Sequence, residues 1–206
     1  MSGLAALDRV REGRAKKVKP PWVRPPFTPG ADAPWVIAFD PSLASTGWAV
    51  MTAQHPFVHE VGTLITKPRD GEEGNLVRGV AIYEQSLELL HRLSHQWRAP
   101  ERGTFLVAHE SPPTGGSALH RPDSIRSASL AVRIAATAAG MPTVMVSDLT
   151  VKKRLVGRSK GVEKADIKAA LTEFWPHLPR ERMRWNEHIR DAVGIGIVAL
   201  EAAHAA

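Results

Sequence analysis

The stretch that decides the fold reads WVIAFDPSLASTG and spans residues 35–47. Its first five residues are apolar, which is typical of a buried β-strand. Asp40 follows this strand at once, and the loop after it ends in Gly47. A carboxylate pressed against a core is unfavourable unless it is paired, protonated or bound to a cation. We therefore interpret Asp40 as a candidate functional residue.

Two more carboxylates border apolar sequence. Glu110 follows the run FLVAH, and Asp191 precedes nine uncharged, mostly apolar residues. If the segment around Asp191 is helical, Glu187 and His188 share its face, because residues three and four apart are neighbours on a helix. A divalent-cation site could then form from Asp40, Glu110, His188 and Asp191. Each acid alone also fits an ordinary role at a strand end or helix cap.

The rest of the chain predicts alternating strands and helices. Besides 35–39, we expect strands over 47–53, 58–66, 104–109 and 142–146. We expect helices from Leu76 to Trp97 and over 124–139, 166–174 and 185–203. The last of these contains VGIGIV, which suits a strand by propensity, but its polar approach and Ala-rich end favour a helix. This order predicts an α/β protein with a mixed sheet flanked by helices.

Composition limits the chemistry. The chain has 206 residues, 43% of them hydrophobic, which is enough for one globular core. No apolar run approaches the ~18 residues that span a bilayer and no signal-like stretch opens the chain, so we expect no membrane segment and a cytoplasmic location. Zero cysteines exclude disulfides and thiolate metal sites. A metal must therefore bind to carboxylates, histidines and water, which favours Mg²⁺ or Mn²⁺.

Two segments carry the excess positive charge. Residues 1–33 have a net charge of +4 and residues 152–164 of +5, against +6 for the whole chain. Such clustering favours binding to a polyanion such as DNA, although a basic tail can also serve solubility alone. The DNA-binding candidates are Lys152, Lys153, Arg158, Lys160 and Lys164. Five prolines between 20 and 29 mark 1–33 as a basic, Pro-rich N-terminal extension, and we place one domain over 34–206.

Four motifs, in order, resemble the RuvC Holliday-junction resolvases of the RNase H-like superfamily. FDPSL…TGWAV at 39–50 resembles the family's strand and D-P-[GS]-L-x-x-T-G loop, and VAHE at 107–110 resembles its strand ending in a catalytic Glu. The sequence 151–164 resembles the family's V-K-x-x-V-x-G loop and the E-K after it. HIRDA at 188–192 resembles the [HD]-x-x-D-A that opens its last helix. The resemblance covers about residues 35–203.

This resemblance implies an RNase H-like fold, with a five-stranded mixed sheet whose first three strands are antiparallel. It implies a metal-dependent crossover junction endodeoxyribonuclease in a bacterial or phage-infected cell. Such an enzyme is a homodimer that resolves four-way (Holliday) junctions by paired symmetric nicks in recombination and repair. The helix over 124–139 corresponds to the family's dimer-forming element. Branched DNA is the expected partner.

The resemblance also implies roles for single residues. Its catalytic and metal-binding positions are Asp40, Glu110, His188 and Asp191. Asp40 would bridge two Mg²⁺ ions, and Glu110 and Asp191 would each bind one of them. His188 would contact metal or the scissile phosphate. Lys164 corresponds to a lysine near that phosphate and Lys152 to one that supports DNA binding.

The chain departs from the family pattern at three places. Pro113 stands three residues after Glu110, where familiar bacterial members have an aromatic residue that stacks at the junction centre. Glu187 beside His188 is a possible additional ligand. The long N-terminal extension is also atypical. Compact RuvC-like proteins of bacteriophages tolerate such changes and often accept branched DNA more broadly, so a phage-type member is one interpretation.

Three other functions share parts of the pattern. One is a broader branched-DNA or RNA/DNA nuclease of the same fold. Another is a non-cleaving nucleic-acid-binding protein, which predicts the loss of an acid that this chain has kept. The third is an ATP-binding phosphotransferase of the actin and sugar-kinase type, which needs two such domains, whereas this chain has length for one.

His55 and His59 flank a turn between two predicted strands. With no third ligand evident nearby, we interpret both as solvated histidines rather than as metal ligands.

Overall fold

The computed structural model describes residues 34–54, 57–67, 71–97, 105–111, 123–174 and 185–204. The N-terminal extension over 1–33, Pro113 and His55 lie outside these described residues. The division of the chain at residue 33 therefore stays a prediction.

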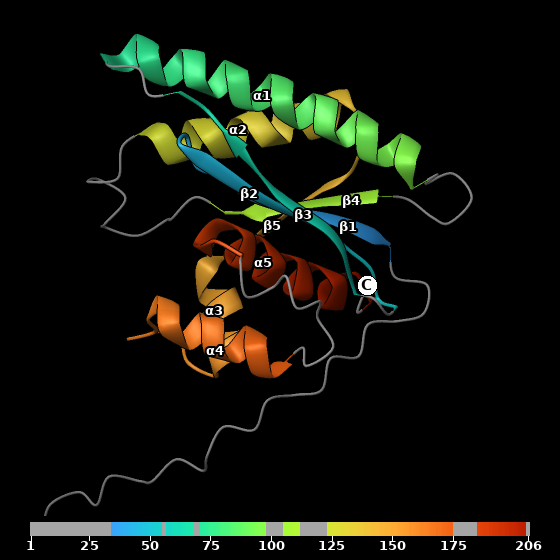
Figure 1. Ribbon diagram of the computed structural model, residues 1–206, viewed down its shortest axis with the longest axis vertical. Helices are drawn as coiled ribbons and strands as arrows, with labels where there is room; N and C mark the ends of the chain where they lie inside the picture. Colours follow the sequence, from blue (N-terminus) through green and yellow to red (C-terminus); the bar gives the residue numbers. More distant parts are fainter. Residues whose placement is uncertain are drawn as a thin grey trace, which may run out of the picture.

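Five strands form one mixed sheet (Figure 1). They are β1 (Trp35–Asp40), β2 (Ser45–Met51), β3 (Val58–Ile65), β4 (Phe105–Glu110) and β5 (Thr143–Val146), in the spatial order β3-β2-β1-β4-β5. The strands β1, β2 and β3 pair antiparallel, and β4 runs parallel to both β1 and β5. The predicted mixed sheet with three antiparallel first strands is confirmed.

Helices cover both faces of the sheet (Figure 1). They are α1 (Gly71–Gln96), α2 (Asp123–Ala138), α3 (Asp148–Val156), α4 (Lys164–Phe174) and α5 (Glu187–His204). The helices α1 and α2 lie on one face, and α5 packs on the other with α3 and α4 beyond it. Among the described residues, no helix is both long and apolar enough to cross a bilayer.

Side-chain alternation along the strands divides the core into two parts. On β1, Val36 and Ala38 join the cluster that contains α5, whereas Ile37 and Phe39 join the cluster beneath α1 and α2. The same alternation on β4 directs its even-numbered residues toward α5. Because successive residues of a strand point to opposite faces, an even-numbered acid at a strand end is directed to the α5 side.

The glycine-rich segment near the C-terminus is helical, as predicted. Gly196 lies where α5 meets the sheet, and a Cβ built there would stand 2.3 Å from the sulfur of Met51. A Cβ on Gly194 would stand 2.8 Å from a methyl group of Val151. The two glycines are explained by close helix packing rather than by strand structure.

One helix was missing from the sequence prediction. Residues 151–157, interpreted above as a loop, lie mostly in α3. Ser147 is its N-cap and accepts a hydrogen bond from the backbone N–H of Thr150, and Asp148 lies in its first turn. Gly157 ends it in the left-handed region, with φ of 79°. These are ordinary helix-end signals, and together they stabilise a helix of only nine residues.

The interpretation of His59 as a solvated side chain was wrong. Its ring stacks on Trp35 with centroids 4.7 Å apart, and its Nε2 lies 2.8 Å from the hydroxyl of Thr52. Burial lowers the pKa of His59, so the folded protein favours the neutral ring.

Candidate active site

Asp40 and Glu110 are brought together by the pairing of β1 with β4. Each is the last residue of its strand, and Phe39 is the register partner of His109 immediately before them. Both are even-numbered and so are directed to the α5 side. The two carboxyl groups are close enough for Asp40 to raise the pKa of Glu110. Two acids that are seventy residues apart in the chain therefore share one end of the sheet.

The loop after Asp40 is held by the hydroxyl groups of Thr46 and Thr66. Thr46 donates a hydrogen bond to the carbonyl of Ser42 (2.9 Å) and accepts one from its N–H (3.2 Å). The hydroxyl of Thr66 donates to the carbonyl of Leu43. These bonds fix the path from β1 to β2 and with it the direction in which Asp40 leaves the sheet.

Gly47 lets the start of α5 approach that loop. A Cβ built on Gly47 would stand 2.2 Å from the carbonyl oxygen of His188. No other residue type fits there without a shift of the helix. The glycine thus allows His188 to reach the acids at the ends of β1 and β4.

His188 is paired with Asp40. Its Nδ1–H donates to Oδ2 of Asp40 at 2.7 Å. This hydrogen bond, with the negative charges around it, raises the pKa of His188 against the opposing effect of burial. The ring is thereby held against Asp40, with its tautomer set by that bond.

The carboxylates of the site repel one another. Burial, then repulsion from Asp40 and Asp148, the hydrogen bond to Asp40 and repulsion from Asp191 raise the pKa of Glu110 to about 8. Burial and repulsion from Asp40 are the main causes that raise the pKa of Asp191 to about 7. The site therefore disfavours the charged forms of its acids, and bound positive charge would favour them.

Asp148 is a fourth acid of the site that sequence reasoning missed. It lies at the start of α3, next to the end of β5, and its charge acts on both Glu110 and Asp191. Its Oδ2 accepts a hydrogen bond from Nζ of Lys152 at 2.7 Å. The N-cap Ser147 directly before it was the available signal.

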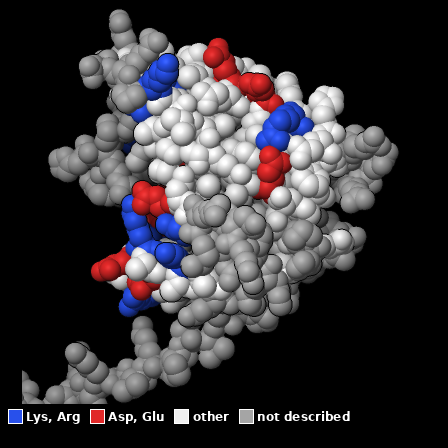
Figure 2. Space-filling view, in the orientation of Figure 1, with Lys and Arg blue, Asp and Glu red and all other residues white. Residues whose placement is uncertain are grey.

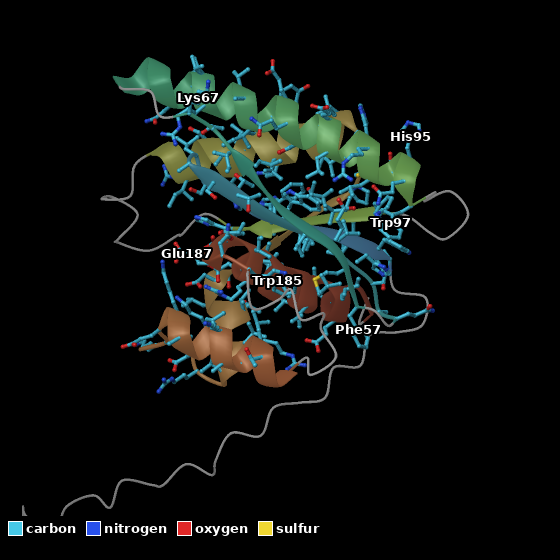
Figure 3. All side chains as sticks on the ribbon, in the orientation of Figure 1. Phe57, Lys67, His95, Trp97, Trp185 and Glu187 are labelled. Carbon is cyan, nitrogen blue, oxygen red and sulfur yellow. The ribbon has the colours of Figure 1, made fainter. Side chains whose placement is uncertain are left out.

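Glu110, Asp148 and Asp191 line a cleft of about 490 Å³ between α3, α4 and α5. Its charged lining comprises Glu110, Asp148, Lys152, Glu163, Lys164, Glu187, Arg190 and Asp191. In Figure 2, Lys and Arg side chains gather next to acidic ones at the left of the view, on the side where Figure 3 labels Glu187. The cleft thus combines an acidic interior with cations at its mouth.

The structure divides the predicted DNA-binding residues. Lys152 and Lys164 line the cleft. Lys153 and Lys160 are exposed outside it, and Arg158 pairs with Asp166 at 3.0 Å. All five lie on α3, on the first residue of α4 or between them.

Glu187, the possible additional ligand, is ion-paired with Lys164. This pair lowers the pKa of Glu187, the hydrogen bond being the largest cause. Glu187 also repels Asp191, where its effect is the smallest of the causes named for that group. In this arrangement its carboxylate belongs to the mouth of the cleft.

The carbonyl of Glu110 is held from the other side of the sheet. His109 donates from Nδ1 at 3.0 Å, and the hydroxyl of Ser129 on α2 lies 3.3 Å away as a second donor. His109 is fully buried and Ser129 nearly so. Burial is the main cause that lowers the pKa of His109, consistent with a neutral ring. The strand that carries Glu110 is therefore anchored to α2.

The donor set fits a hard divalent cation in its chemistry. Asp40, Glu110 and Asp191 offer oxygen ligands only, and their mutual repulsion would be relieved by bound positive charge. Within the described part of the chain, no three His, Asp or Glu side chains already stand in an arrangement that could hold a metal ion. Binding would thus require small side-chain movements in the cleft.

The sheet order and the helices around it define the RNase H-like fold of RuvC. The structure is similar to that of Thermus thermophilus RuvC, with a TM-score of 0.58 and 22% identity, covering 83% of this chain and 95% of that one. T. thermophilus RuvC in complex with a Holliday junction substrate gives a TM-score of 0.58 and 20% identity, with the same coverage. The yeast mitochondrial Holliday junction resolvase Ydc2 gives a TM-score of 0.52 and 11% identity, covering 89% of this chain and 82% of that one.

These similarities confirm the predicted resemblance at the level of the fold. Scans against protein-family models and against the sequences of curated proteins gave no match. Structure thus supports the resemblance that the short motifs had indicated.

Proposed function

We propose that this protein is a metal-dependent, structure-selective DNA endonuclease that resolves four-way junctions by paired symmetric nicks. The observation that carries the proposal is the grouping of three acids in a RuvC-like fold: Glu110 and Asp191 line one cleft, and the charge of Asp40 raises the pKa of both. Three acids with shared repulsion, bordered by cations, suit a site that binds metal ions and a phosphodiester.

In this proposal the chain's own residues divide the work. Asp40, Glu110 and Asp191 hold Mg²⁺ or Mn²⁺, two ions in each site. Bound ions of this kind activate an attacking water and stabilise the leaving oxygen in phosphodiester hydrolysis. His188 orients Asp40 through the 2.7 Å hydrogen bond.

DNA binding falls to the basic side of the molecule. Lys152 and Lys164 contact phosphates at the cleft, and Lys153, Arg158 and Lys160 extend the contact outside it. The branched DNA that this requires is expected in the cytoplasm of a bacterial or phage-infected cell. That location, and a phage origin, stay predictions.

A second copy of the chain completes the proposal, since two symmetric nicks need two sites. An apolar groove of about 320 Å³ lies between α1 and α2 on the face opposite the cleft. Leu76, Leu130 and Ile134 line it and are 70%, 53% and 49% exposed. An exposed apolar patch of this kind is typical of a protein–protein interface. We assign this α1–α2 groove to the homodimer.

One sequence observation favours a broader nuclease as the second candidate. Pro113 replaces the aromatic residue with which familiar RuvC proteins stack at the junction centre. A chain without that residue would distinguish junctions less strictly from flaps and forks.

A substrate panel tests the proposal. Purified protein with Mg²⁺ is incubated with end-labelled four-way junction, flap, fork and duplex DNA, and the products are separated on a denaturing gel. We expect symmetric nicks in the junction that require Mg²⁺ and disappear in excess EDTA. Equal cutting of flaps and forks would favour the broader nuclease, and no cutting of any DNA would contradict the proposal.

A further inference from the structure

One face of the first turns of α5 carries three charged residues into the cleft. Glu187, Arg190 and Asp191 follow the spacing of three and four that defines a helix face, and all three line the cleft. Arg190 occupies a variable position of the [HD]-x-x-D motif, for which the family resemblance implies no role. Its place in the lining is a finding of the structure.

Arg190 and Lys164 both act on the carboxylate of Glu187. Lys164 is ion-paired with Glu187. The charge of Arg190 contributes to lowering the pKa of Glu187, and as a like charge it opposes the rise in the pKa of Lys164. Arg190 is therefore close to both partners, and the three side chains together carry one net positive charge.

The guanidinium of Arg190 is held in place by the backbone. Its Nη1 donates a hydrogen bond to the carbonyl of Trp185, whose side chain is buried. A guanidinium has five N–H donors in a fixed plane, so one such bond orients the whole group. A fixed planar donor beside a lysine is a geometry suited to a phosphate.

We propose that Arg190 and Lys164 form a phosphate clamp at the mouth of the cleft, and that Glu187 occupies this clamp in the DNA-free protein. A backbone phosphate of DNA takes the place of the Glu187 carboxylate on binding. The inference rests on the proposed nuclease function and adds Arg190 and Glu187 to it: Arg190 as a specific phosphate contact, and Glu187 as an internal competitor of the DNA.

The exchange is favourable because the ion pair it breaks is exposed. The side chains of Lys164 and Glu187 are 78% and 42% exposed, and ion pairs so exposed to solvent contribute little to stability. A DNA phosphate bound in the clamp contacts two cations, Lys164 and Arg190, and the counterions of the DNA are released. Glu187 nevertheless has to leave the clamp, so it weakens DNA binding. The two neighbours on α5 therefore have opposite effects on affinity.

The test measures junction binding in EDTA, where nicking is suppressed. Fluorescence anisotropy of a labelled four-way junction is recorded between about 50 and 200 mM KCl, the range over which phosphate contacts are strongly screened. The proteins are the wild type, Arg190→Gln, Arg190→Lys and Glu187→Gln. Arg92→Gln is the matched control, because Arg92 lies on α1, away from the cleft, and pairs with Glu60 of β3.

Opposite shifts are expected from the two positions. Arg190→Gln lowers the affinity about tenfold and reduces the salt slope by about one, as the loss of one phosphate contact requires. Arg190→Lys restores part of the affinity. Glu187→Gln raises the affinity about two- to fivefold, in keeping with a weak exposed pair. Arg92→Gln matches the wild type.

Three results would overturn the clamp. One is wild-type affinity and salt slope in Arg190→Gln. Another is unchanged or weaker junction binding in Glu187→Gln. The third is weaker Mn²⁺ binding of Glu187→Gln by calorimetry, which would make Glu187 a metal ligand. Circular dichroism checks that each variant is folded. If wild type nicks junctions and these variants bind like it, only the clamp fails; if wild type neither binds nor nicks, the proposed function fails as well.

Discussion

The two faces of the sheet depart from ordinary protein surfaces in opposite ways. On the α5 side, Glu110 at the end of β4 and Asp191 on α5 have raised pKa values. On the α1–α2 side, large apolar side chains are left in solvent. Neither arrangement helps the isolated chain to fold, because charge repulsion and exposed apolar surface both lower stability. Such local conflicts with folding rules are where function is expected.

The largest effect is expected from breaking the acidic face at Asp40. Asp40→Asn keeps the size of the side chain but removes a charge that would bind both ions. We expect nicking of a four-way junction to fall roughly 1000-fold, since metal ions supply several kcal/mol of transition-state stabilisation. A single-turnover gel assay measures this loss.

Junction binding is the control for that variant. Anisotropy in EDTA should give nearly wild-type affinity, because the proposal assigns Asp40 to the metal ions and not to the DNA. Mn²⁺ should raise the melting temperature of the wild type more than that of Asp40→Asn. Undiminished nicking by Asp40→Asn would refute the assignment of the acidic face.

The apolar face can be broken at Leu130. Leu130→Asp places a charge in the α1–α2 groove, and we expect the dimer dissociation constant to rise about 30- to 100-fold, as for a central apolar contact. Sedimentation over a range of concentrations measures it. Leu149→Asp is the matched control, because Leu149 is 58% exposed on α3, outside the groove. Equal weakening by both variants, or a monomeric wild type, would remove the interface from this face.

A smaller effect is expected at Gly47, where the acidic face is assembled. Gly47→Ala forces the start of α5 away from β2, and we expect a loss of about 1–3 kcal/mol in the free energy of unfolding. Urea denaturation measures it, and nicking should fall too because His188 shifts from Asp40. Gly79→Ala is the control, since the nearest side-chain atom to a Cβ there is 3.9 Å away. Stability unchanged by Gly47→Ala would show that α5 adapts freely.

The smallest effect concerns the pH dependence of stability and His59, which stacks on Trp35. The folded protein holds the pKa of His59 below its value of 6.5. The contribution of His59 to the free energy of unfolding is therefore complete above pH 6.5. It is lost as the pH falls below that value, because the unfolded chain binds the proton more readily. The loss stays below about 1.4 kcal/mol per pH unit, the limit for one proton.

His59→Phe isolates this contribution. Phenylalanine keeps an aromatic ring against Trp35 and cannot titrate, while the lost contact with Thr52 gives an offset independent of pH. Urea denaturation of both proteins between pH 7.5 and 5.5 (about one pH unit either side of 6.5) should show a difference that shifts in favour of the variant on acidification. A constant difference would mean that His59 titrates normally.

Local sequence was sufficient for what depends on alternation and helix spacing. Asp40 and Glu110 could be placed at strand ends, and His188 with Asp191 on one helix face, because these periods are fixed by the backbone. Asp148 and the short helix α3 escaped, since a helix of this length depends on its caps and on packing. Arg190 and His59 escaped for another reason: a cleft wall and an aromatic stack are formed by residues distant in the chain.

Helix α2 contacts the end of β4 and lines the exposed groove through consecutive residues. The hydroxyl of Ser129 lies 3.3 Å from the carbonyl oxygen of Glu110, and the next side chain, Leu130, leaves the helix into the exposed groove. Any association of two chains that slides α2 along its axis must stretch or shorten that one oxygen–oxygen distance. In the proposed homodimer, the hydroxyl of Ser129 would therefore link the α1–α2 groove to the strand that carries Glu110.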